Sequence, residues 1–156
     1  MKKISLVSIV VFLIDRITKI IVTNIFKVNV RNVIINKFLY ITNCHNDGAA
    51  FSLFSGNILF LILITFIVLF LLYKNIKNSN RIKKITIMAY GLLLGGILGN
   101  LFDRVFYGYV IDFIDLLIFK YDFAIFNFAD ICICIGAIML LFEGSDRSEQ
   151  NKISSR

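Results

Sequence analysis

The chain has 156 residues, of which 58% are hydrophobic and 16 are Phe. A single soluble domain of this length has too little interior to bury so much apolar surface, so the composition excludes an ordinary soluble protein and favours one embedded in lipid. The formal net charge is +7, but the basic residues lie in short segments between apolar runs, which argues for membrane topology and against nucleic-acid binding.

Four apolar segments follow one another along the chain, each near the roughly 20 residues that a helix needs to cross the hydrocarbon core of a bilayer. We expect helices there, because lipid cannot satisfy free backbone N–H and C=O groups. The second segment has no charged residue, and the fourth contains one, Asp130. The segments cover about residues 4–26, 57–73, 85–102 and 123–142.

The first segment has a second interpretation, because its basic start and uncharged run resemble a cleavable signal peptide. However, the run is followed by Asp15, Arg16 and Lys19 rather than by a cleavage site of small residues. A retained first helix is therefore preferred.

Basic residues indicate the orientation of these helices. Residues 74–84 carry a dense basic group, made of Lys74, Lys77, Arg81, Lys83 and Lys84. The positive-inside rule places this loop and both chain ends in the cytoplasm, which leaves residues 27–56 and 103–122 outside. We expect a single transmembrane domain over residues 1–142 in the cell membrane, followed by a solvated cytoplasmic tail over residues 143–156.

The two outer segments carry strand signals. Residues 28–33 alternate apolar and polar side chains, and residues 38–42 and 105–119 are rich in β-branched and aromatic types, with Gly108 as a turn. The predicted fold is therefore an all-α membrane protein with four transmembrane helices and a small extracytoplasmic β-sheet.

Polar residues within the apolar segments are candidates for function, because a charge at the centre of a membrane helix costs roughly 2.5–3.5 kcal/mol. Residues three or four apart share a helix face, which groups Asp15 with Lys19, Asn100 with Asp103 and Arg104, and Asn127 with Asp130. Asp112 lies in the outer loop before the fourth helix. The topology places all these groups at the outer side, where the small pair Gly95 and Gly99 would let helices approach closely.

Two of these carboxylates, Asp112 and Asp130, have no base beside them in the sequence. One alternative is that the polar groups only hold helices together, which suits Asp15 in the first helix and Asp103 beside Arg104 in the third. Two unpaired carboxylates at one membrane depth favour a catalytic dyad instead.

Two close carboxylates at low dielectric share one proton, so one serves as general base on a water molecule and the other as general acid. That chemistry suits peptide hydrolysis without a metal or a protein nucleophile. The chain has one histidine, His45, and no HExxH motif, and Ser52 and Ser55 lack an evident activating base. Its three cysteines, an odd number, do not make a disulfide framework.

Five short motifs lie between about residues 4 and 142. They are Asp15-Arg16-Ile17-Thr18-Lys19, Asn46-Asp47-Gly48-Ala49-Ala50-Phe51-Ser52, Gly95-Gly96-Ile97-Leu98-Gly99-Asn100-Leu101-Phe102-Asp103-Arg104, Val110-Ile111-Asp112-Phe113 and Phe126-Asn127-Phe128-Ala129-Asp130. Each is weak alone, but together and in this order they resemble the lipoprotein signal peptidase family, also called signal peptidase II.

The resemblance implies that Asp112, in the Val-x-Asp-Phe motif, and Asp130, in the Phe-Asn-x-Ala-Asp motif, are catalytic. Supporting or substrate-binding positions fall on Asp15, Lys19, Asn46, Asn100, Arg104 and Asn127. The implied substrate is a prolipoprotein whose lipobox cysteine already carries a diacylglyceryl group, and the enzyme cuts just before that cysteine. No metal or other cofactor is implied.

Two positions depart from the family pattern: Asp47, where the family often has Thr, and Ala124, where many members have Pro. Asp47 adds a negative charge near the site, with a bearing on substrate preference or pH dependence. Phe51 either covers the site or anchors the outer loop at the membrane interface. Should one carboxylate of the dyad be wrong, Asp103 and Asp115 are next.

Two other classes of function remain open. Charges in membrane helices also mark transport pathways, and a small transporter would show flux in sealed vesicles without any dependence on a lipobox. A non-catalytic assembly subunit would use the charges only between helices, so Asp130→Asn would leave its function nearly intact. As a peptidase, the protein is expected to be a monomer whose partners are the bilayer and prolipoproteins, with no nucleic acid.

Overall fold

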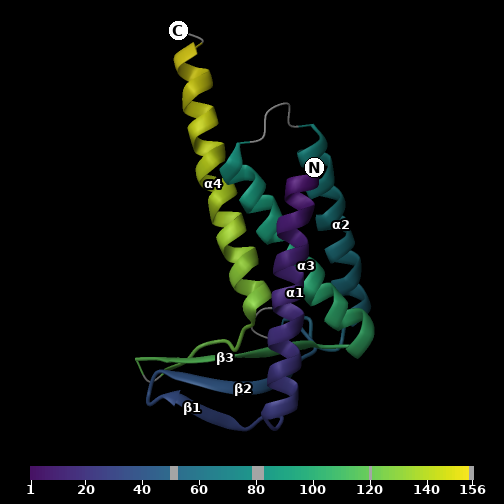
Figure 1. The fold of residues 1–156 in the computed structure, drawn as a ribbon, viewed down its shortest axis with the longest axis vertical. Coiled ribbons are helices and arrows are strands. Elements are labelled where there is room, and N and C mark those ends of the chain that lie inside the picture. The colour runs from purple at the N-terminus through teal and green to yellow at the C-terminus, as the bar shows by residue number, and fades with distance from the viewer. Residues whose placement is uncertain (50–52, 79–82, 120, 155–156) are drawn as a thin grey trace.

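The computed structural model describes residues 1–49, 53–78, 83–119 and 121–154. Within them, four long helices are α1 (Lys2–Ile25), α2 (Ile58–Lys77), α3 (Lys84–Tyr107) and α4 (Phe128–Ser154), and four strands are β1 (Arg31–Ile35), β2 (Leu39–Asn46), β3 (Val110–Ile118) and β4 (Tyr121–Asp122). The sheet lies across one end of the helices, and both termini lie toward the other end (Figure 1). The prediction of a mostly helical fold with a small sheet is confirmed.

Among the described residues, α2 and α3 are long and apolar enough to cross a membrane. The α2 helix buries only Leu61 and Ile76, and Leu59 is 83% exposed. A helix that is uncharged up to its last turn and turns most of its apolar side chains outward needs an apolar solvent.

The α3 helix lies in the middle of the helix group and packs closely against α1 and α4 through glycines. A Cβ at Gly99 would lie 2.5 Å from Asp15 Oδ2 in α1, and a Cβ at Gly96 would lie 2.5 Å from the Ala129 carbonyl oxygen in α4. Larger residues here would separate the helices. The close approach predicted from the glycines of this segment is therefore confirmed.

The four strands form one antiparallel sheet in the order β1-β2-β3-β4. Along the β2–β3 pair, Cys44 lies opposite Asp112 and Asn46 lies opposite Val110, after a register shift that begins at Ile41. The register therefore places the end of β2 beside the Asp112 main chain.

The strand boundaries differ from the prediction at two places. The strand expected at residues 28–33 begins instead at Arg31, because Asn29 has a φ of +59° and its N–H donates to the Asn43 carbonyl at 2.8 Å. The strand expected from residue 105 begins at Val110, because α3 continues to Tyr107 and ends at Gly108, whose φ is +77°. A left-handed glycine after the last helical residue is a common helix C-terminal cap.

The fourth helix also has different limits from the predicted 123–142. It begins at Phe128, because the residues before it run beside β3. There the main chains of Ile114 and Phe126 form hydrogen bonds with each other. It continues through residues 143–154, the predicted solvated tail. The first residue of this segment, Glu143, packs against α3: it is buried and accepts a 2.6 Å hydrogen bond from Thr86 Oγ1.

Candidate active site

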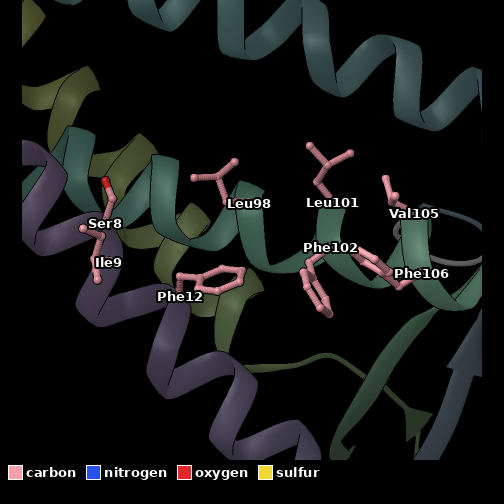
Figure 2. Close-up of a pocket in the computed structure, with 8 residues that line it drawn as sticks. All are labelled: Ser8, Ile9, Phe12, Leu98, Leu101, Phe102, Val105 and Phe106. Carbon is pink, nitrogen blue, oxygen red and sulfur yellow. The ribbon is translucent and has the colours of Figure 1, made fainter.

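Two of the hollows formed by the described residues have linings that differ in chemistry. One, of about 390 Å³, lies between α1 and α3 (Figure 2), and its only polar lining residue is Ser8, whose hydroxyl donates to the Ile4 carbonyl. The other, of about 560 Å³, is lined by Asp112, Asp130, Arg104 and the amides of Asn46 and Asn100, with an apolar wall from residues 123–126 and α4. Groups suited to acid–base chemistry occur only in the second lining.

The carboxylates of Asp112 and Asp130 reach this cavity from different elements. Asp112 lies in β3 and is 3% exposed, and Asp130 lies in the first turn of α4. Two amides join them: Asn127 Nδ2 donates to Asp112 Oδ1 at 2.7 Å and to Asn100 Oδ1 at 3.1 Å. Asn100 Nδ2 then donates to Asp130 Oδ1 at 2.8 Å. The structure thus brings together both predicted catalytic carboxylates and two of the predicted asparagines, Asn100 and Asn127.

Asn127 precedes α4 rather than lying on it, and it caps that helix. The Asp130 N–H donates to Asn127 Oδ1, and the Asn127 N–H donates to Asp130 Oδ2, each at 3.0 Å. This reciprocal pair is a capping box, which fixes the Asp130 carboxylate at the positive end of the helix dipole. The spacing Asn-x-x-Asp is a capping signal in its own right, so the sequence held the information that the helix starts here.

Asn46 and Arg104 connect the loop after β2 to the cavity. Asn46 Nδ2 donates to Asp112 Oδ2 at 2.8 Å, and Asn46 Oδ1 accepts the Gly48 N–H at 2.9 Å. Arg104 donates to the Gly48 carbonyl at 2.9 Å. The resemblance implies a supporting or substrate-binding position for both, and the structure shows Asn46 hydrogen-bonded to a carboxylate of the pair itself.

A cluster of four charges lies beside the amide chain, between α1 and α3. Lys19 Nζ is 3.0 Å from Asp15 Oδ2, 2.7 Å from Asp103 Oδ2 and 2.9 Å from Asn100 Oδ1. Arg16 pairs with Asp15 at 3.0 Å and with Asp103 at 2.7 Å. The predicted grouping of Asp15 with Lys19 is therefore seen, and Arg16 is a member that the sequence reasoning missed.

The pairing of Asp103 with Arg104 suggested by their adjacency is wrong. Successive helix residues point about 100° apart, so Asp103 faces α1 and its two cations while Arg104 faces the outer loop. The helix spacing alone could not show which neighbouring helix each side chain meets.

Burial, together with the nearby negative charge of Asp130, raises the pKa of Asp112 to about 7, and the hydrogen bonds from Asn46 and Asn127 act in the opposite direction. Asp112 is therefore protonated in a large share of molecules at neutral pH. Asp115, three residues along β3, has the opposite environment: two 2.7 Å hydrogen bonds from Arg31 lower its pKa. A carboxylate so engaged is a poor substitute for Asp112.

The remaining sequence candidates differ in their relation to the cavity. The Asp47 carboxylate accepts hydrogen bonds from the Ser55 hydroxyl at 2.6 Å and the Gly56 N–H at 3.2 Å, within its own loop. Ala124 lines the cavity. Phe51 and Ser52 lie outside the described residues. Over the described part of the chain, no three His, Cys, Asp or Glu side chains gather in a way that could hold a metal ion.

Comparison with known proteins assigns the family. The family model described as Signal peptidase (SPase) II matches residues 7–144. The chain belongs to the signal peptidase II family. A lipoprotein signal peptidase of Staphylococcus carnosus (strain TM300) is 38% identical over 150 residues, which cover 94% of this chain and 92% of that protein. One of Staphylococcus aureus (strain bovine RF122 / ET3-1) is 40% identical over 136 residues, or 87% and 83% of the two chains.

Two solved structures, both of bacterial membrane enzymes determined by the in meso method, share the fold of this signal peptidase II. The first has a TM-score of 0.87 at 35% identity and covers 96% of this chain and 92% of its own. The second has a TM-score of 0.81 at 37% identity and covers 92% of both. The predicted family, its peptidase activity and its membrane character are confirmed.

Proposed function

We propose that Asp112 and Asp130 are the catalytic pair with which this signal peptidase II removes signal peptides from prolipoproteins. The observation that carries the proposal is the joining of both carboxylates, in one cavity, by the Asn100–Asn127 amide chain. Side chains held by such bonds keep a catalytic geometry that free rotamers would lose.

The surroundings of the pair favour one allocation of the shared proton. Asp130 lies at a helix N-terminus and accepts bonds from a backbone N–H and from Asn100, which suits a carboxylate anion. Asp112 is buried in β3 with a raised pKa, which suits the neutral acid. Asp130 is therefore the general base and Asp112 the general acid.

In the first step Asp130 takes a proton from water, the water oxygen forms a bond to the scissile carbonyl carbon, and Asp112 gives its proton to the carbonyl oxygen. In the second step the C–N bond breaks. The proton now on Asp130 goes to the leaving nitrogen, and the proton on the carbonyl oxygen returns to Asp112. The products are a free amine and a carboxylic acid, and both aspartates regain their starting states.

The cavity lining supports a substrate that is partly peptide and partly lipid. At one side are Asn46, Arg104 and the two aspartates, and at the other is an apolar wall that includes Ile131 and Ile135 of α4. A scissile peptide bond fits the polar side, and the acyl chains of a diacylglyceryl cysteine fit the apolar side. This arrangement supports the cleavage position that the family resemblance implies, just before the lipid-modified lipobox cysteine.

The same proposal includes four membrane crossings in the cell membrane by a monomer with both termini in the cytoplasm. The sheet lies at one end of the helices and the termini toward the other (Figure 1). Asp112 is in β3 of this sheet, and Asp130 is in the first turn of α4. Lys74 and Lys77 end α2 and Lys84 begins α3, which places basic charge at the end away from the sheet. The positive-inside rule makes that end cytoplasmic and the active site outward-facing.

The test is cleavage of a diacylglyceryl-modified prolipoprotein by the purified protein in detergent, beside Asp112→Asn and Asp130→Asn. Asp122→Asn is the matched control, because its side chain is 70% exposed at the sheet edge and does not line the cavity. We expect cleavage by the parent and the control and none by the two dyad variants. Cleavage that survives in either dyad variant would sink the assignment.

The lipid requirement has its own test, with the same prolipoprotein carrying an unmodified cysteine. We expect the parent to leave it uncut. Equal cleavage of the modified and unmodified forms would refute the lipid part of the proposal, and flux through sealed vesicles without cleavage would favour a transporter.

A further inference from the structure

The buried charge cluster between α1 and α3 does more than join two helices. Asp15 and Asp103 are both 0% exposed, and each accepts a hydrogen bond from a main-chain N–H outside its own helix. Asp103 Oδ2 accepts the Ile111 N–H and Asp15 Oδ1 accepts the Ala129 N–H, both at 3.2 Å. Ile111 directly precedes Asp112, and Ala129 directly precedes Asp130.

The two contacts are equivalent in function although they lie on different elements. Ala129 is in the first turn of α4, where N–H groups have no partner within the helix, so Asp15 caps α4 from a neighbouring helix. Asp103 holds the start of β3 in the same way. Each carboxylate thus fixes the backbone one residue before a member of the proposed catalytic pair.

One cation connects the two anchors to the amide chain. Lys19 Nζ has three protons, and it lies within hydrogen-bond distance of Asp15, Asp103 and Asn100. Arg16 pairs with both carboxylates but makes no hydrogen bond to the main chain beside Asp112 or Asp130 among the described residues.

Stability alone is a poor reason for such a cluster. Desolvating buried charges costs several kcal/mol per ion, and replacing a buried ion network by well-packed apolar residues is often neutral or stabilising. The contacts to Ile111 and Ala129 supply the missing reason, because a misplacement of about 1 Å at a catalytic group can cost about 100-fold in rate.

We propose that Asp103 and Asp15 are positioning residues, each of which holds the main chain directly before one aspartate of the catalytic pair, with Lys19 joining the two. The inference rests on the proposed roles of Asp112 and Asp130. This role gives Asp103 a function in catalysis, whereas the sequence suggested only that it holds helices together.

The experiment measures kcat, KM and the thermal midpoint of purified Asp103→Leu, Asp103→Asn and Arg16→Met on the lipid-modified prolipoprotein. Asp103→Leu removes the acceptor of the Ile111 N–H. Asp103→Asn removes the charge and keeps an acceptor oxygen. Arg16→Met removes two ion pairs, as an Asp103 variant does, and leaves both anchors in place.

We expect kcat to fall about 100-fold in Asp103→Leu with little change in KM, and Asp103→Asn to recover much of the loss. Arg16→Met should lower the thermal midpoint while retaining most of the parent's kcat. If the three variants lose kcat in proportion to their loss of thermal stability, Asp103 is a structural residue and the proposal is overturned.

The Asp112→Asn and Asp130→Asn variants, run beside this series, separate the two proposals. If both are inactive, and kcat in the Asp103 and Arg16 variants falls only in proportion to their thermal stability, only the positioning role fails. If they cleave like the parent, the catalytic pair is wrong and the positioning role fails with it.

Discussion

Asp112→Asn should make the protein more stable at neutral and alkaline pH while abolishing cleavage. In the folded protein the pKa of Asp112 is raised from 3.8 to about 7, chiefly by burial. The folded state therefore binds one more proton than the unfolded state between these two values, and the free energy of unfolding falls as the pH rises through that window. At about 1.4 kcal/mol for each pKa unit, the loss reaches about 4 kcal/mol above pH 7.

An asparagine at this position imitates the neutral acid and does not titrate, so the variant escapes the loss. The thermal midpoints of variant and parent should be close below pH 4 and separate as the pH rises, by about 10 °C above pH 7. The assay is thermal unfolding in detergent from pH 4 to pH 9, with Asp122→Asn as the exposed-carboxylate control. A difference between Asp112→Asn and the parent that stays constant with pH would show that Asp112 titrates normally, and the physical case for a protonated Asp112 would fail.

Three further outcomes follow from the site. Cleavage should decline as the pH rises through about 7, because Asp112 then loses the proton that it donates; a rate that still climbs above pH 8 contradicts this role. Asn46→Ala should lower kcat about tenfold while the protein stays folded, since it removes one hydrogen bond that holds the Asp112 side chain; full activity would remove Asn46 from the site. Gly99→Ala should lower both kcat and the thermal midpoint, because its Cβ would displace Asp15, whereas Gly91→Ala, equally close to Val7, should lower only the midpoint; equal kcat in the two variants would refute the distinction.

The helices were predictable because hydropathy and length are local properties of the sequence. Residues four apart share a helix face whatever the tertiary structure, so the grouping of Asp15 with Lys19 followed from spacing alone. The prediction that Asp112 and Asp130 form a pair came instead from their lack of a neighbouring base and from the order of the five motifs, since a β3 residue and an α4 residue have no fixed separation that spacing can supply.

Contacts between elements were not predictable in this way. The partners of Asp103 depend on which face of α3 meets α1, and the glycines that set this approach carry no direction. The bond between Asn46 and Asp112 depends on the β2–β3 register, which shifts between Ile41 and Cys44. A period-two pattern shows that a strand exists but does not locate such an irregularity.

The positioning role of Asp103 leads to one more prediction, in which stability and activity change in opposite directions. The double variant Arg16→Met/Asp103→Leu removes one cation and one anion and leaves Asp15 paired with Lys19 at 3.0 Å, so no uncompensated charge stays buried. Such a replacement is often neutral or stabilising, by about 1–4 kcal/mol. The double variant should therefore unfold at or above the midpoint of the parent.

Its kcat should nevertheless fall about 100-fold, as in Asp103→Leu alone, because the Ile111 N–H has lost its acceptor. Thermal unfolding and single-turnover cleavage on the same preparation measure both quantities. A double variant with parental stability and parental kcat would show that the cluster is dispensable for both. A stable but slow variant would show that this membrane enzyme retains the buried Asp103 carboxylate for the placement of Asp112.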